Sequence, residues 1–172
     1  MKHNIKKGCR VALLGENYFT PMNDSHMSKR RGDALQKSFG ALLEHQPSLV
    51  YLCPTRGVNI NLLPLLTINN IPFVLIFPCK HFLATLTASE KFVLDAATDK
   101  AQRIVILSEE KSSPLQWEED WYKGTKRAVD SSDWVMVVHS PGYENIAFAD
   151  LMYKFKKSTK PVLAVAIGEE PQ

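Results

Sequence analysis

The chain has 172 residues, of which 45% are hydrophobic and 23% are charged, and its formal net charge is +3. A chain of this length suits one domain that buries its own core without metals or disulfides. The basic residues are scattered in small groups, and a protein that binds nucleic acid usually concentrates them on one tract or face. Composition therefore indicates an ordinary globular domain and gives no indication of nucleic-acid binding.

The cysteines and the amino-terminal sequence indicate in which cellular compartment the protein is expected. Cys9, Cys53 and Cys79 are an odd number without CxxC spacing, and each adjoins an apolar run. Such cysteines are typical of buried, reduced thiols in a cytosolic protein. The sequence MKHNIKKGCRVALLG holds an apolar run of about five residues, too short for a signal peptide or a membrane span. We therefore expect a cytoplasmic protein that does not engage a membrane.

Apolar, β-rich runs alternate with segments of helical spacing through the first half of the chain. Strands are predicted over residues 10–14, 49–53 and 72–77. A long helix is predicted over 28–44, with Ser28 as a candidate cap. A shorter apolar helix is predicted over 59–68, and Pro64 leaves open whether that helix begins only there.

The second half continues the same alternation. In chain order it predicts helix 89–98, strand 103–107, helix 117–129, strand 134–138, helix 145–155 and strand 162–167. Asp133 immediately precedes the fifth strand and is expected to cap or orient its start. Alternation of this kind is typical of an α/β protein with a parallel sheet covered on both faces. We therefore expect one domain over residues 1–172, a three-layer sandwich with a mainly parallel sheet of six strands flanked by helices.

Five segments, in this order and spacing, carry a resemblance to a known family. They are LLGENYF, VYLCPTRGVNINLLPLL, IPFVLIFP, SPLQWEEDWYKGTKRAVDSSDWVMVV and KPVLAVAI. Together they resemble the SLOG superfamily of Rossmann-like proteins, in particular its YpsA-like branch, which is related to the LOG and DprA groups. The resemblance implies a Rossmann-like fold, a nucleotide or nucleotide-derived ligand above the strand ends, a role in sensing or sequestering that ligand, and a homodimer or higher homo-oligomer.

Two departures from the family pattern bear on catalysis. The turn after the second strand reads CPTRGVN, with Asn59 where an acidic residue is common, and an amide cannot act as a carboxylate base. The loop SPGYEN after the fifth strand keeps one glycine and no threonine, unlike the glycine- and threonine-rich phosphate turn of the LOG branch. Both departures argue against hydrolysis through the usual site.

Candidate ligand contacts lie in the three loops that follow the first, second and fifth strands. They are Gly15, Glu16, Asn17, Tyr18, Thr55, Arg56, Gly57, Asn59, Ser140, Gly142, Tyr143, Glu144 and Asn145. A helix amino terminus after Gly142, together with Arg56, would hold phosphate. Tyr18 or Tyr143 would stack on a base, and Asn59 or Glu144 would bind ribose hydroxyls.

Several alternatives stay open at this point. A nucleoside-phosphate hydrolase or deoxyribosyl-transfer enzyme would use Glu144, although no catalytic residue stands out. A protein-interaction module with a vestigial site would expose Trp117, Trp121 and Tyr122. The basic cluster at residues 29–31 and the lone His81 are weaker candidates for ligand contact. The histidines form no metal-binding pattern, so we expect no metal. The sequence indicates no particular cofactor, and a nucleotide-derived ligand is what the resemblance implies.

Overall fold

A computed structural model describes residues 7–15, 25–55, 58–80, 86–109, 116–139 and 160–166, and within these ranges it gives only the backbone at residues 25–31, 33, 34, 117, 118, 139 and 166. The described strands are β1 (Arg10–Gly15), β2 (Leu49–Leu52), β3 (Phe73–Phe77), β4 (Arg103–Ile106), β5 (Trp134–His139) and β6 (Val162–Ala166). The described helices are α1 (Ser25–His45), α2 (Val58–Ile68), α3 (Ala88–Lys100) and α4 (Trp117–Ser131).

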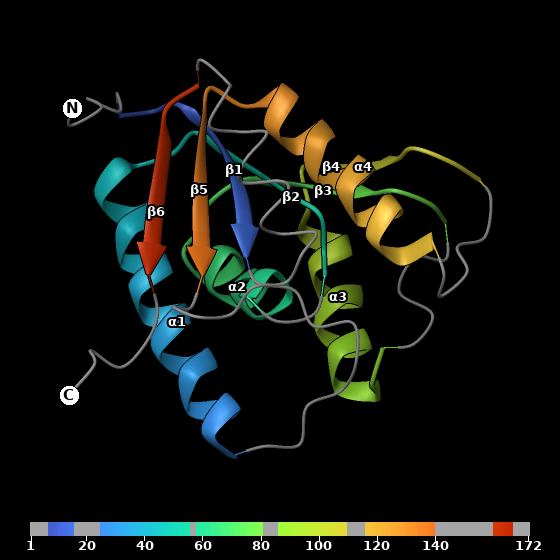
Figure 1. Cartoon of the computed structure of the whole chain (residues 1–172), viewed down its shortest axis with the longest axis horizontal. Coiled ribbons are helices and arrows are strands. Elements are labelled where there is room, and N and C mark those ends of the chain that lie inside the picture. Colours follow the sequence, from blue (N-terminus) through green and yellow to red (C-terminus); the bar gives the residue numbers. More distant parts are fainter. Residues whose placement is uncertain are drawn as a thin grey trace.

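The six described strands form one sheet in the order β4-β3-β2-β1-β5-β6, and every neighbouring pair is parallel. Figure 1 shows the arrows of β1, β5 and β6 pointing the same way, with α4 on the opposite side of the sheet from α1, α2 and α3. The predicted α/β fold, a Rossmann-like three-layer arrangement, is therefore confirmed.

Apolar side chains fill the space on both faces of the sheet. On one face, Leu42 of α1, Leu62 of α2 and Leu94 of α3 pack in a single cluster against alternate strand residues. On the other face, Trp121 and Val129 of α4 pack against the intervening strand residues. Because the central strands are covered on both faces, they consist of continuous apolar runs instead of alternating ones.

Two details of the first helices differ from the expectation. α1 begins at Ser25, three residues earlier than predicted, so Ser28 lies inside the helix and is not its cap. α2 begins at Val58 and carries Pro64 within it, so the alternative of a helix that begins at Pro64 is wrong. Pro64 is exposed, so its ring points away from the core. The cost of the missing N–H bond is offset by the six residues of α2 that are buried.

The amino end of α3 carries a signal that the expected range 89–98 missed. Thr87 Oγ1 accepts a hydrogen bond from Glu90 N, and the Glu90 carboxylate accepts one from Thr87 N, which forms a capping box. The spacing Thr-x-x-Glu in the sequence would have placed the helix start at Ala88. The helix expected over residues 145–155 lies outside the described residues.

Candidate functional site

The loops after β1, β2 and β5 leave the sheet at one edge, because parallel strands all end on the same side (Figure 1). From β1 the chain adds β2, β3 and β4 on one side and then returns to place β5 on the other side of β1. Such a reversal is a topological switch point, where open α/β sheets bind ligands. Gly15 at the end of β1 pairs in register with Val138 of β5, so the two loops that follow begin side by side.

Gly15 lies directly against the first turn of α2. A Cβ atom at position 15 would lie 2.4 Å from Val58 Cβ and 2.9 Å from Asn59 Oδ1. Real side chains do not approach so closely, so the helix can take this place only beside a glycine. The structure therefore brings Gly15 and Asn59, two of the predicted contacts from different loops, into direct proximity.

Asn59 is 3% exposed and connects α2 to the ends of two strands. Its Nδ2 donates to Cys53 O at 2.9 Å and more weakly to Leu13 O at 3.4 Å. Its Oδ1 has no hydrogen-bond partner among the residues that the structure describes. Asn59 was predicted to bind ribose hydroxyls. Its Nδ2 is engaged by the backbone, so Oδ1 is the atom left to accept from a donor.

Thr55 is 2% exposed and fixes the turn between β2 and α2 through its backbone. Thr55 N donates to Cys53 O at 2.9 Å, and Thr55 O accepts from Ile60 N at 3.2 Å. Its hydroxyl, like Asn59 Oδ1, lacks a partner within the described part of the chain. A buried polar atom without a partner costs about 1–3 kcal/mol, so two of them in one turn mark a place where an added partner would stabilise the protein.

The other predicted contacts lie outside the described residues. They are Glu16, Asn17, Tyr18, Arg56, Gly57, Ser140, Gly142, Tyr143, Glu144 and Asn145. The weaker candidate His81 and the side chains of residues 29–31 lie outside them as well. Of the three predicted loops, the structure thus describes the point where each begins and the start of α2.

Cys53 directly follows β2 and is buried against α4. A Cβ at Gly124 of α4 would lie 2.9 Å from Cys53 Sγ, so α4 crosses the end of β2 at close range. Burial, with smaller effects from Cys79 and Asp120, raises the pKa of the Cys53 thiol far above its ordinary value. All three cysteines of the chain are described and free. Because the buried Cys53 thiol stays protonated, it contributes to packing and is a poor nucleophile.

At the opposite, amino-terminal edge of the sheet, Asp133 has the orienting role that the sequence predicted. Its carboxylate accepts from Arg10 N at 2.9 Å, from Arg10 Nε at 3.2 Å and from Arg10 Nη2 at 3.0 Å. These hydrogen bonds from Arg10 hold the pKa of Asp133 below its ordinary value, against a small opposing effect of burial. The pair joins the starts of β1 and β5.

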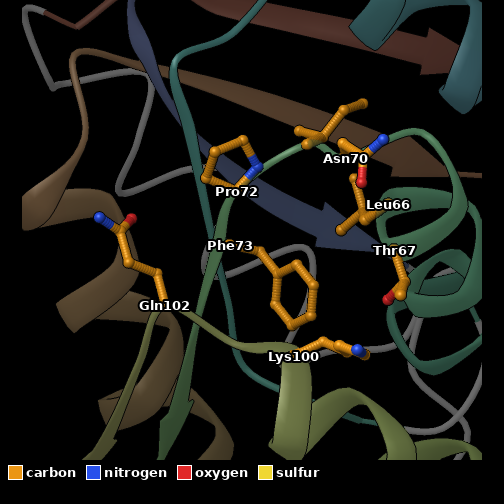
Figure 2. A pocket seen from close by; sticks show the side chains of 8 residues that line it. Leu66, Thr67, Asn70, Pro72, Phe73, Lys100 and Gln102 are labelled. Atoms are coloured by element: carbon orange, nitrogen blue, oxygen red, sulfur yellow. The ribbon is translucent and has the colours of Figure 1, made fainter.

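A hollow of about 270 Å³ also lies at that amino-terminal edge, between the ends of α2 and α3 (Figure 2). Leu66 and Phe73 form its floor, and Asn70, Lys100 and Gln102 lie around it. The carboxyl ends of two helices carry partial negative charge and disfavour an anion, and Lys100 is the one cation among the residues that line it. The hollow is also smaller than the roughly 300–1,000 Å³ of most ligand pockets.

Across the described ranges, no three His, Cys, Asp or Glu side chains come together as metal ligands, and no helix has the length and apolar character to cross a membrane. No protein-family model matches the sequence, and no curated protein matches it.

Proposed function

We propose that this protein binds a nucleotide or a nucleotide-derived small molecule at the carboxyl edge of the sheet, as a sensor or sequestering protein of a SLOG-like, YpsA-like family. The observation that carries the proposal is the pair of buried oxygens, Thr55 Oγ1 and Asn59 Oδ1, without partners among the described residues. They lie in the turn that starts α2, next to the switch point between β1 and β5. A ligand with hydroxyl or amino donors would satisfy both oxygens.

Electrostatics at the start of α2 favour the same class of ligand. The amino end of an 11-residue helix carries partial positive charge, and α2 has no acidic residue in its first turn to neutralise it. In the proposal, Arg56 and the helix start after Gly142 add to this anion site, Tyr18 or Tyr143 stacks on the base, and Glu144 binds ribose. The free cysteines, two of which are buried, support a cytoplasmic location. The proposal also includes a homodimer or higher homo-oligomer.

Isothermal titration calorimetry with ADP-ribose, cyclic dinucleotides and NAD-related compounds tests the proposal. Thr55→Val removes only the unpartnered hydroxyl, so we expect it to weaken binding by about threefold to tenfold. Thr67→Val is the matched control, because Thr67 Oγ1 donates to Leu63 O at the far end of the same helix. We expect Thr67→Val to bind as the wild type does.

Two results would count against the proposal. One is the absence of heat with every compound in the panel at protein concentrations well above micromolar. The other is equal binding by wild type and Thr55→Val, which would remove the buried oxygens from the argument. Chromatography of the same mixtures for released base distinguishes binding from the hydrolase alternative. The interaction-module alternative required an exposed Trp121, but Trp121 lies on the buried face of α4, packed against the sheet.

A further inference from the structure

Strand β4 forms one edge of the described sheet, and its apolar side chains are exposed. Within the described part of the chain it pairs with β3 alone. Ile104, Ile106 and Leu107 are 39%, 45% and 39% exposed, and they are three of the six large apolar side chains recorded as exposed in the described residues. Half of the exposed large apolar side chains of the described residues therefore lie on this edge or directly after it.

Among the described residues, this edge lacks the features that natural proteins use to keep an edge strand from pairing. Those features are lysine, proline, an inward charge or a covering segment, and they are needed because an edge strand presents unpaired N–H and C=O groups. Residues 103–107 read RIVIL, with one charge, at the first position, and no proline or glycine. On the opposite edge β6 is better protected, because Val162, Leu163 and Val165 are half-buried and its exposed described side chain is the small Ala164.

The charges around β4 are complementary to a second copy in the antiparallel direction. Lys100 at the end of α3 and Arg103 at the start of the strand are exposed, and Glu109 is exposed just beyond the strand's end, where it lies 3.5 Å from Lys80 Nζ. An ion pair this exposed contributes little, so Glu109 can also interact with a cation of a second copy. In an antiparallel pair, Lys100 and Arg103 of each copy would lie beside Glu109 of the other copy, although Lys80 next to Glu109 reduces the attraction. Two parallel copies would bring like charges together, which is unfavourable.

We propose that the β4 edge, residues 103–107, pairs antiparallel with the same edge of a second copy, so that the sheet continues across a two-fold axis. Such an interface is self-complementary, as two-fold symmetry requires. On the α3 side of the sheet it brings Ile104 and Ile106 of both copies together. The contact is a short strand pair, so the dimer is weak and depends on concentration. This extends the proposed homo-oligomer by naming its surface, and it does not depend on ligand binding.

Analytical ultracentrifugation of the full chain over a concentration series tests the β4 edge. We expect a reversible dimer, and we expect Ile104→Lys to raise its dissociation constant by at least about tenfold, because two lysines replace apolar contacts. Leu43→Lys is the matched control, since Leu43 is 45% exposed near the end of α1, a helix that packs against α2 and β6. It should leave the dissociation constant unchanged, and circular dichroism should show both variants folded.

Hydrogen exchange of the wild type gives a second measurement that needs no variant. Backbone amides of residues 103–107 should exchange more slowly at concentrations where the dimer forms than in dilute solution. A protein that stays monomeric at every concentration overturns both the β4 interface and the proposed homo-oligomer. A dimer that persists unchanged in Ile104→Lys, with no concentration-dependent protection of β4, overturns the β4 interface alone.

Discussion

Asn59 shows how one buried amide can hold three elements at the edge where the ligand is proposed to bind. Its Nδ2 donates to Cys53 O, so a change from amide to carboxylate would replace a donor with an acceptor facing a carbonyl oxygen. A carboxylate also gains from the positive end of α2, by about 0.3–1 kcal/mol. The buried, unpaired acceptors cost more than that gain, at about 1–3 kcal/mol or above.

We therefore predict that Asn59→Asp lowers the free energy of unfolding by about 1–3 kcal/mol at pH 7. Burial raises the pKa of such a carboxyl, so at about pH 4 it is protonated, donates to the carbonyl and loses less stability. Urea denaturation at both pH values measures this. Asn69→Asp is the control, because Asn69 Nδ2 makes the same kind of bond, to Leu65 O at 2.9 Å, on the exposed end of α2. An equal loss at both pH values would contradict the explanation.

At the scale of elements, two helical glycines have opposite surroundings. Gly40 of α1 is exposed, and an added Cβ would meet nothing within 4 Å. Glycine in a helix interior is less favourable than alanine because it loses more backbone entropy on folding. We predict that Gly40→Ala stabilises the protein by about 0.5–1 kcal/mol, measured as a higher urea midpoint with an unchanged slope.

Gly124 of α4 gives the opposite prediction for the same substitution. An added Cβ would lie 2.9 Å from Cys53 Sγ and 3.3 Å from Pro78 Cδ, so α4 would have to move away from β2 and β3. Overpacking of this kind costs about 1–3 kcal/mol, which exceeds the gain in helix propensity. Gly124→Ala should therefore lower the urea midpoint, and a stabilised Gly124→Ala protein would show that α4 is not held at this distance.

Hydrophobic patterns in the sequence predicted where the strands and helices lie, but they did not predict the position of each strand in the sheet. Apolar runs and helical spacing located the six described strands and four described helices, because burial on a face follows local periodicity. The same pattern could not distinguish a central strand from an edge strand. RVALL of β1 is buried throughout its apolar part, whereas RIVIL of β4, with nearly the same composition, is largely exposed.

The site was predictable only in part, for a related reason. Loops after strands pointed to the carboxyl edge, and the register of Gly15 with Val138 agrees with that placement. The partners of Asn59 were not predictable, since Leu13 is 46 residues away in the chain and its contact is set by the packing of α2 on β1. The sequence therefore suggested a ligand contact where part of the side chain has a structural role.

At the scale of the whole molecule, the β1–β5 pair joins the run β1 to β4 with the returning strands β5 and β6. Arg10 and Asp133 close its amino end, where Asp133 N also donates to Arg10 O at 2.9 Å. The pKa of Asp133 is lowered in the folded state, so its contribution to stability is complete above the unfolded value of about 3.9 and is lost as the pH falls through the lowered pKa.

We accordingly predict that Asp133→Asn lowers the melting temperature at pH 7, and that wild type and variant converge as the pH falls through the lowered pKa of Asp133. Differential scanning calorimetry across this pH range measures the effect. Asp130→Asn is the matched control, because Asp130 forms a 2.9 Å ion pair with Lys126 within the exposed surface of α4 alone. A pair inside one helix joins no distant strands, so we expect Asp130→Asn to change the melting temperature little. If both variants melt alike, or if the Asp133→Asn deficit does not shrink as the pH falls, the ion pair does not stabilise the junction between the two parts of the sheet.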